Sequence, residues 1–153
     1  MFHPHPGISG LIVGLAIFLL IGTCAYLSRG PGPFDLDPQA KPGGFEPFLA
    51  KYVRVSEFII GLATGPIVFL IGSSALQGQG GRLPWFFASP LLLLTVSVVY
   101  GIAFMVWLTY RYEEYQRGVP HTRFAYSLSL SLGFSSLACF GVGYIWLILK
   151  VAG

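Results

Sequence analysis

Charged residues are scarce in this chain of 153 residues, because Asp, Glu, Lys and Arg together make up only 10% of it. Soluble domains usually carry about 25% charged residues. Hydrophobic residues account for 54% of the chain, and the mean hydropathy is +0.71. This composition argues against an ordinary soluble domain and favours a protein that is surrounded largely by lipid.

Asparagine is absent, and cysteine occurs only at Cys24 and Cys139. Without Asn the chain has no N-glycosylation sequon. The two cysteines form neither a CxxC pair nor a Cys/His group with metal-ligand spacing. The net charge of +3 is spread between the hydrophobic stretches rather than gathered in a patch, so it does not indicate nucleic-acid binding. We therefore predict no metal, no cofactor and no nucleic-acid partner.

Four stretches contain no Asp, Glu, Lys or Arg: 1–28, 58–81, 83–110 and 124–149. A helix of about 20 mostly apolar residues crosses the hydrocarbon layer of a bilayer, which is about 30 Å thick. The sequence predicts an all-α fold, an integral membrane four-helix bundle, with spanning helices at approximately 8–27, 57–77, 89–112 and 124–149. Too few residues remain outside for a separate soluble domain, so residues 1–153 are predicted to form one transmembrane domain.

The basic residues predict an orientation. The segments that follow the first and third stretches hold seven of the nine Lys and Arg residues, whereas Arg82 and Lys150 lie in the other segments. Basic loops stay in the cytoplasm, which predicts cytoplasmic loops at 28–56 and 113–123 and both termini outside. No basic residue precedes the first stretch, so we interpret it as a retained helix rather than a signal peptide. We expect a multi-pass protein of the plasma membrane, the inner membrane in a bacterium.

Small residues indicate where helices pack closely. At 100° per residue they share faces of the first three predicted helices. The residues concerned are Gly10 and Gly14 in the first helix, Gly61, Gly65 and Gly72 in the second, and Ser97 and Gly101 in the third.

The fourth predicted helix has two small-residue faces on approximately opposite sides. One consists of Ser127, Ser131 and Ser135, and the other of Ser129, Gly133, Ser136 and Gly143. From this double pattern we predict that one face packs inside the bundle. The other face is predicted to bind a second copy of the chain or another membrane protein.

The second predicted helix has two features of functional interest. Gly65 and Pro66 lie near its middle, where proline removes a ladder hydrogen bond, so a kink is expected there. A hinge or binding site at this kink is a candidate interpretation beside ordinary packing. Glu57 follows Ser56, the predicted N-cap, and is either a capping carboxylate or a proton or cation contact. The preceding residues 45–55 are either a short helix on the inner leaflet or a simple approach to the second helix.

Tyr100 is expected to face protein, because a hydroxyl in the middle of the membrane needs a hydrogen-bond partner. The segment 111–123 carries the densest set of reactive side chains, including Glu113, Glu114 and His121. It is interpreted either as a solvated connector that contacts anionic lipids or as a site for metal or proton transfer.

Three function classes remain. The first choice is a structural or accessory subunit of a larger membrane assembly or homo-oligomer, which needs only lipid-facing helices and small-residue faces. The alternative is a small transporter, channel or lipid-handling protein that uses the break at Gly65 and Pro66. A membrane enzyme ranks third, because no nucleophile, base and orienting partner can be placed together from their spacing.

Overall fold

The computed structural model describes residues 6–28, 46–72, 87–118 and 122–152, and these ranges consist of helices with short turns at their ends. The helices are α1 (Pro6–Leu27), α2 (Glu46–Gly72), α3 (Ala88–Gln116) and α4 (Arg123–Ala152). All four are long and apolar enough to cross a membrane. The prediction of four apolar helices is confirmed, and they indicate a multi-pass integral membrane protein.

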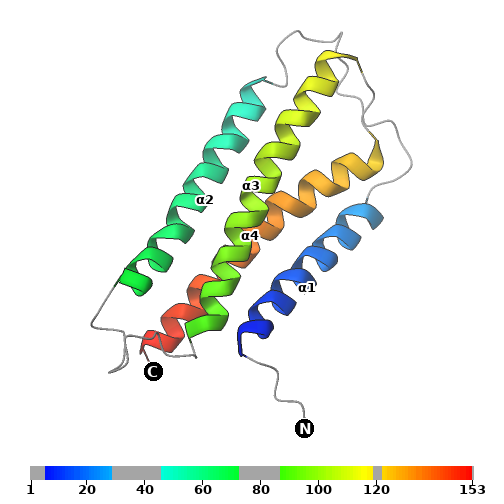
Figure 1. Cartoon of the computed structure of the whole chain (residues 1–153). Coiled ribbons are helices and arrows are strands. Elements are labelled where there is room, and N and C mark those ends of the chain that lie inside the picture. Colours follow the sequence, from blue (N-terminus) through cyan, green and yellow to red (C-terminus); the bar gives the residue numbers. More distant parts are fainter. Residues whose placement is uncertain (1–5, 29–45, 73–86, 119–121, 153) are drawn as a thin grey trace.

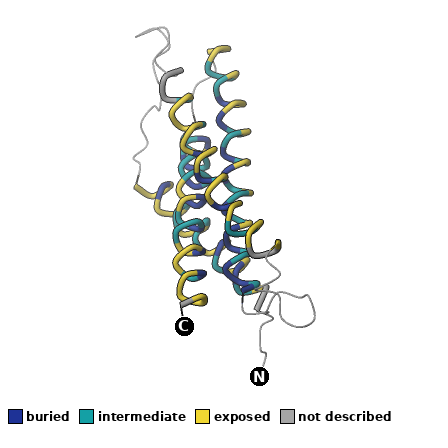
Figure 2. Tube along the Cα trace, turned by 90° about the vertical axis from the view of Figure 1, so that its left-hand side faces the viewer, coloured by how far each residue is buried: buried dark blue, intermediate teal, exposed yellow. Residues whose placement is uncertain are grey.

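The helices run alternately in opposite directions, so α1 begins and α4 ends at the same end of the molecule (Figure 1). The centre is formed by α3 and α4. α1 packs against both of them, whereas α2 packs mainly against α3 and meets α4 only sparsely. Within the described ranges α1 and α2 make no contact. Buried residues lie where the helices face one another, and the outward faces are exposed (Figure 2).

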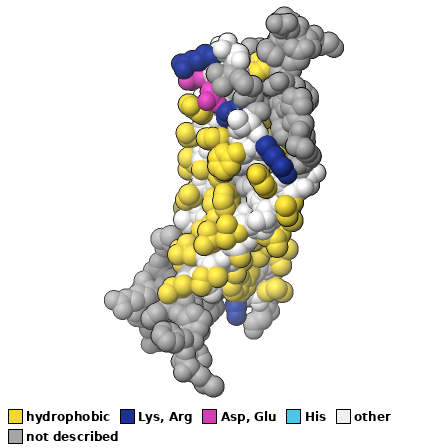
Figure 3. All heavy atoms as spheres, turned by 90° about the vertical axis from the view of Figure 1, so that its right-hand side faces the viewer, with side chains coloured by type: hydrophobic (Ala, Val, Ile, Leu, Met, Phe, Trp, Pro, Cys, Tyr) yellow, Lys and Arg dark blue, Asp and Glu magenta, His cyan; other side chains and the backbone are white. Residues whose placement is uncertain are grey.

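Large apolar side chains cover the outward faces of the bundle. Leu20, Phe69, Phe124 and Ile145 are each more than half exposed. Figure 3 shows hydrophobic side chains over the middle of one side, with charged side chains gathered mainly toward one end. Extensive apolar surface of this kind is expected where lipid rather than water surrounds the protein.

The predicted glycine face of α1 is its contact with α3. A Cβ atom added at Gly10 would lie 2.5 Å from the backbone oxygen of Ser89, and one added at Gly14 would lie 2.8 Å from Cγ1 of Val96. At the same crossing the hydroxyls of Ser9 and Ser89 are 2.9 Å apart. Only glycine permits this approach of the two helices, as small-residue packing in membranes requires.

A reciprocal pair of hydrogen bonds joins α3 to α4. The Ser97 hydroxyl donates to the Ser136 carbonyl at 2.7 Å, and the Ser136 hydroxyl donates to the Ser97 carbonyl at 2.9 Å. Next to this pair, a Cβ atom at Gly101 would lie 3.2 Å from the Ser136 hydroxyl. The predicted small-residue face of α3 therefore packs inside the bundle.

Both small-residue faces of α4 also lie inside the bundle. On one face the Ser127 hydroxyl donates to the Gly22 carbonyl of α1 at 3.3 Å. On the other face, Cβ atoms at Gly133 and Gly143 would lie 3.3 Å and 3.2 Å from side-chain atoms of Phe104 and Leu94 in α3. The expectation that one face of α4 binds another chain is therefore wrong, because α1 covers one face and α3 the other.

The start of α2 differs from the prediction. The helix begins at Glu46 rather than at 57. Of the two interpretations of residues 45–55, the helical one agrees with the structure, but the helix is continuous with the rest of α2 rather than separate. Ser56 lies inside the helix, and the predicted N-cap at this position is wrong. The physical reason is local, because Pro47 is tolerated in a first helical turn and residues 48–55 contain neither glycine nor proline. The predicted end at 77 lies outside the described residues.

The predicted glycine face of α2 remains uncovered. Gly61, Gly65 and Gly72 are exposed, and in the described part of the chain no atom lies within 4 Å of a Cβ added at any of them. α2 continues as a single helix through Pro66 (Figure 1). The Thr64 hydroxyl donates to the Ile60 carbonyl at 2.7 Å, which satisfies this hydroxyl without a neighbouring helix.

The two glycine faces predict opposite responses to one added methyl group. Gly10→Ala should lower the free energy of unfolding by about 1–3 kcal/mol, because the added carbon meets a backbone oxygen that cannot move away. Gly61→Ala, the matched control, should leave stability unchanged or raise it. Thermal unfolding in mild detergent measures both, and equal melting temperatures for the two variants would contradict the α1–α3 packing.

Candidate functional site

A cavity of about 470 Å³ lies between α2 and α4, with α3 forming its floor. We call it the α2–α4 crevice. Its lining residues are Tyr52, Val55, Ser56 and Ile59 of α2, Phe104, Leu108 and Arg111 of α3, and Ala125, Tyr126, Ser129, Leu130, Gly133, Phe134, Ser136 and Leu137 of α4. The lining is mainly apolar, and among these residues only Arg111 carries a charge at neutral pH.

The crevice arises because α4 crosses α3 at an angle. The beginning of α4 therefore lies at a distance from the first half of α2 (Figure 1). Small residues of α4 leave the space unfilled, namely Ala125, Ser129 and Gly133. Phe104 fills the floor, where its ring lies edge-on to Tyr52 at 6.1 Å between centroids. A Cβ atom at Gly133 would lie 3.3 Å from the same ring, so α3 and α4 are in close contact beneath the cavity.

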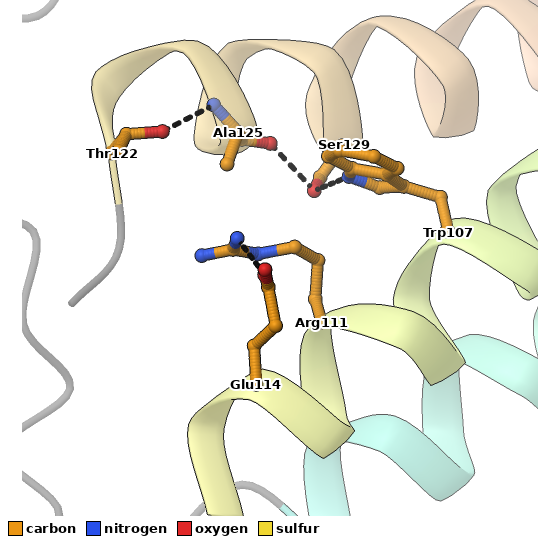
Figure 4. Close-up of polar contacts among 6 residues, drawn as sticks. All are labelled: Trp107, Arg111, Glu114, Thr122, Ala125 and Ser129. Atoms are coloured by element: carbon orange, nitrogen blue, oxygen red, sulfur yellow. Dashed lines mark hydrogen bonds and ion pairs between the residues drawn. The ribbon is translucent and has the colours of Figure 1, made fainter. Parts of the chain in front are cut away.

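Arg111 forms the polar end of the crevice. It is only 7% exposed, and its guanidinium group forms an ion pair with the carboxylate of Glu114, one turn further along α3. Figure 4 shows the Arg111 side chain extending toward the first turn of α4, with the Glu114 carboxylate against it. A buried arginine requires such a partner, because an unpaired charge away from water is costly.

The first turn of α4 lies beside this polar end. Thr122 acts as its N-cap, since the Thr122 hydroxyl accepts a hydrogen bond from the Ala125 backbone N–H at 3.2 Å. The Ser129 hydroxyl donates to the Ala125 carbonyl at 2.9 Å and accepts from the Trp107 indole at 3.0 Å (Figure 4). These contacts fix the start of α4 against α3 and hold the upper wall of the crevice in place.

When α3 is placed across a bilayer, the crevice extends from one membrane boundary toward the middle of the span. From Pro90 to Arg111 the rise of α3 is about 32 Å, which matches the thickness of the hydrocarbon layer. Arg111 therefore lies at the level of the headgroups when Pro90 lies at the opposite boundary. From Ala125 to Leu137 the wall of α4 is about 18 Å long. The cavity thus has a charged end at the boundary and an apolar interior.

The structure separates the candidate residues of the sequence analysis. Glu57 is exposed within α2 and does not line the crevice. Gly65 and Pro66 lie further along α2, also outside the lining. The Tyr100 hydroxyl has a hydrogen-bond partner in α1, because it donates to the Gly14 carbonyl at 3.3 Å. Its ring stacks on Phe18 at 5.3 Å, in the interface between α1 and α3.

The acidic candidates near the end of α3 have different environments. Glu113 is exposed, whereas Glu114 is the partner of Arg111. His121 lies outside the described residues. In the described part of the chain, no group of three His, Cys, Asp or Glu side chains is placed to hold a metal ion.

Sequence reasoning missed the importance of Arg111, which was one of several charged residues in a segment interpreted as a connector. A helical projection carries a signal for it. Phe104, Leu108 and Arg111 follow one another at spacings of four and three, so they share one face of α3. An arginine that continues an apolar face, rather than the polar face of a projecting helix, indicates a buried position.

A second arginine, Arg123, joins α4 to α1 at the same end of the bundle. The Arg123 guanidinium donates to the Tyr26 carbonyl near the end of α1, and it lies over the Tyr26 ring at 4.4 Å from the centroid. A cation near a helix C-terminus is favourable, because the last carbonyls carry partial negative charge. Arg123 thus fastens α4 to α1 on the side of α4 away from the crevice.

Comparison of the chain with protein families, with curated proteins and with solved structures gives no match.

Proposed function

We propose that this chain is a lipid-handling membrane protein that holds one membrane lipid in the α2–α4 crevice. The observation that carries the proposal is a cavity of about 470 Å³ among membrane-spanning helices, with apolar walls and one buried arginine at its end. Sites for small molecules usually enclose about 300–1,000 Å³ and combine apolar walls with a few polar groups. The crevice has this size and this composition.

Access from the bilayer supports a lipid as the occupant. Tyr52 and Val55 on the α2 side, and Phe134 and Leu137 on the α4 side, line the crevice and are each about half exposed. At this depth their exposed surface faces hydrocarbon chains, so the cavity opens sideways into lipid. A molecule already dissolved in the membrane enters such an opening without crossing water.

The orientation of the bundle completes the proposal. The end that carries Arg111 also carries most Lys and Arg residues, and basic segments are retained in the cytoplasm. We therefore place the charged end of the crevice in the inner leaflet and both termini outside, in the plasma membrane or the inner membrane of a bacterium.

The uncovered face of α2 favours a second function, that of an accessory subunit. Gly61, Gly65, Val68 and Gly72 follow one another at helical spacing, and all four are exposed. They lie about 180° around α2 from the residues that line the crevice. Glycines at this spacing allow the backbone of another helix to approach closely. The partner is a helix of another membrane protein or of a second copy of the chain.

Filling the crevice should weaken lipid binding. Val55→Trp places a large ring in the opening, and the matched control Val68→Trp places the same ring on the opposite face of α2. Both valines are more than half exposed, so both variants should fold. Val55→Trp should weaken lipid retention about tenfold, the loss expected when two buried methylene contacts of about 0.8 kcal/mol each are removed.

Native mass spectrometry of the detergent-purified protein, titrated with a lipid of defined chains, measures this retention. The control should bind as the unchanged protein does. If neither variant alters retention, or if the unchanged protein retains no lipid, the proposed function is wrong.

The orientation predicts the behaviour of reporters fused after Gly153. Alkaline phosphatase is active only outside the cytoplasm, so it should be active at this position, and a reporter that works only in the cytoplasm should be silent. The same pair fused after Gly118 should give the reverse result. Activity of the cytoplasmic reporter at Gly153 would overturn the proposed orientation.

The accessory function predicts that Gly65→Leu releases a partner from the purified complex. Gly141→Leu is the matched control, because in the described part of the chain a Cβ at Gly65 or at Gly141 meets no atom within 4 Å. Both variants should fold, and only Gly65→Leu should lose co-purifying proteins or reduce the oligomer size in mild detergent. A monomeric unchanged protein without companions would contradict this function.

A further inference from the structure

We propose that the occupant of the α2–α4 crevice is an anionic lipid, with its negatively charged headgroup bound by Arg111 beside the first turn of α4 and an acyl chain along the crevice. This inference rests on the proposed lipid-binding function and names the chemical class of the ligand. It follows from the charge at the polar end of the cavity and from the depth of that end in the membrane.

The first argument is the burial of Arg111. A guanidinium group that is only 7% exposed is expensive to place at this position, and an apolar residue would close the end of the cavity at lower cost. Arginine offers five N–H donors in a planar fork that matches the oxygens of a phosphate or a carboxylate. The fork projects from the floor of the crevice at the level of lipid headgroups, where phosphate groups are abundant.

The second argument is the role of Glu114. It binds the guanidinium group from the same helix, one turn away, and keeps the polar end neutral. The Glu114 side chain is 20% exposed, so it has access to water when it leaves the guanidinium group. A lipid phosphate can then replace the Glu114 carboxylate as a partner of Arg111, while the Glu114 carboxylate moves into water one turn further along α3.

The third argument is the start of α4. The first turn of this helix contains no acidic residue, and its Ala125 and Tyr126 line the crevice. The N-terminus of a helix carries partial positive charge and attracts anions. Together with Arg111 it makes the polar end of the crevice favourable for a negative group. Glu57, an acidic residue of the neighbouring half of α2, is exposed and does not line the cavity.

The test compares two lipids with identical acyl chains, phosphatidylglycerol and phosphatidylcholine, by native mass spectrometry of the full-length protein. The unchanged protein should retain phosphatidylglycerol about tenfold more strongly, because both lipids carry the phosphate but only phosphatidylcholine also carries a cationic choline group, which Arg111 repels. Arg111→Gln should remove this preference, and it should weaken phosphatidylcholine binding less than phosphatidylglycerol binding, because both phosphates lose the guanidinium group but the choline repulsion is lost as well. Glu114→Gln should strengthen phosphatidylglycerol binding, because the competing carboxylate is lost.

Arg117→Gln is the matched control, since it removes the same charge from an exposed position at the end of α3, outside the crevice. It should retain the preference of the unchanged protein. If Arg111→Gln does not fold, Arg111→Lys keeps the charge but loses the planar fork, and it should show a reduced preference. Inorganic phosphate at millimolar concentration should not displace the lipid, because it lacks the acyl chain.

The ways in which this proposal can fail are distinguishable. Equal retention of both lipids, with loss of both in Val55→Trp, would overturn the anionic headgroup and leave the lipid-binding function standing. Equal effects of Arg111→Gln and Arg117→Gln would overturn the site at Arg111 in favour of general surface attraction. Displacement of the lipid by inorganic phosphate would overturn the lipid in favour of a soluble anion. Retention of no lipid at all would overturn the proposed function itself.

Discussion

Close backbone approach at glycine and serine is the interaction on which this bundle depends. In a bilayer the lipid chains are as apolar as the side chains, so burial of leucine does not drive helices together as it does in water. α1, α3 and α4 associate instead where Gly10 meets the Ser89 carbonyl and where Ser97 and Ser136 exchange hydrogen bonds. These contacts also satisfy polar groups that have no water available at this depth. These close contacts therefore join the three helices directly.

α2 meets α3 through larger side chains, with Ile60 against Gly101, and the glycines of α2 take no part in this contact; the crevice is the consequence. Its glycines point away from the bundle, and its inward face presents Ile59, Ile60 and Ala63 to α3. Packing of larger side chains keeps α2 further from α4, where small residues leave room. The same distribution of residues that tightens the α1–α3–α4 contacts thus opens a cavity on the other side of α3. Bulky residues in place of Ala125, Ser129 and Gly133 would fill this space.

The sequence predicted the number of helices and their apolar character, because uncharged apolar stretches of about 20 residues are typical of membrane-spanning helices. It also located the contact face of α1, since Gly10 and Gly14 share a side of the helix. It did not predict which neighbour each face meets. The two small-residue faces of α4 looked like one internal and one external surface, but a central helix has neighbours on both sides.

The start of α2 was misplaced for a different reason. The charged residues just before position 58 indicated where the apolar span begins, but the helix itself begins earlier and includes those charged residues. The sequence did not distinguish Arg111 from the exposed charged residues near it. Arg111 differs from them because it lies on the same face of α3 as Phe104 and Leu108.

The opposite faces of α2 relate the two proposed functions to each other. The residues that line the crevice and the exposed glycines are about 180° apart, so a partner helix at Gly61 and Gly65 does not block the cavity. α2 packs on α3 and only sparsely on α4, so a small displacement of it changes the width of the crevice without breaking the contacts among α1, α3 and α4. A lipid between α2 and α4 adds contacts to both helices and thereby fixes the position of α2. Because a partner helix on the outer face would bind the same rigid element, binding on one face favours binding on the other whenever both require the same position of α2. The sparse contact between α2 and α4 is what makes such coupling physically available.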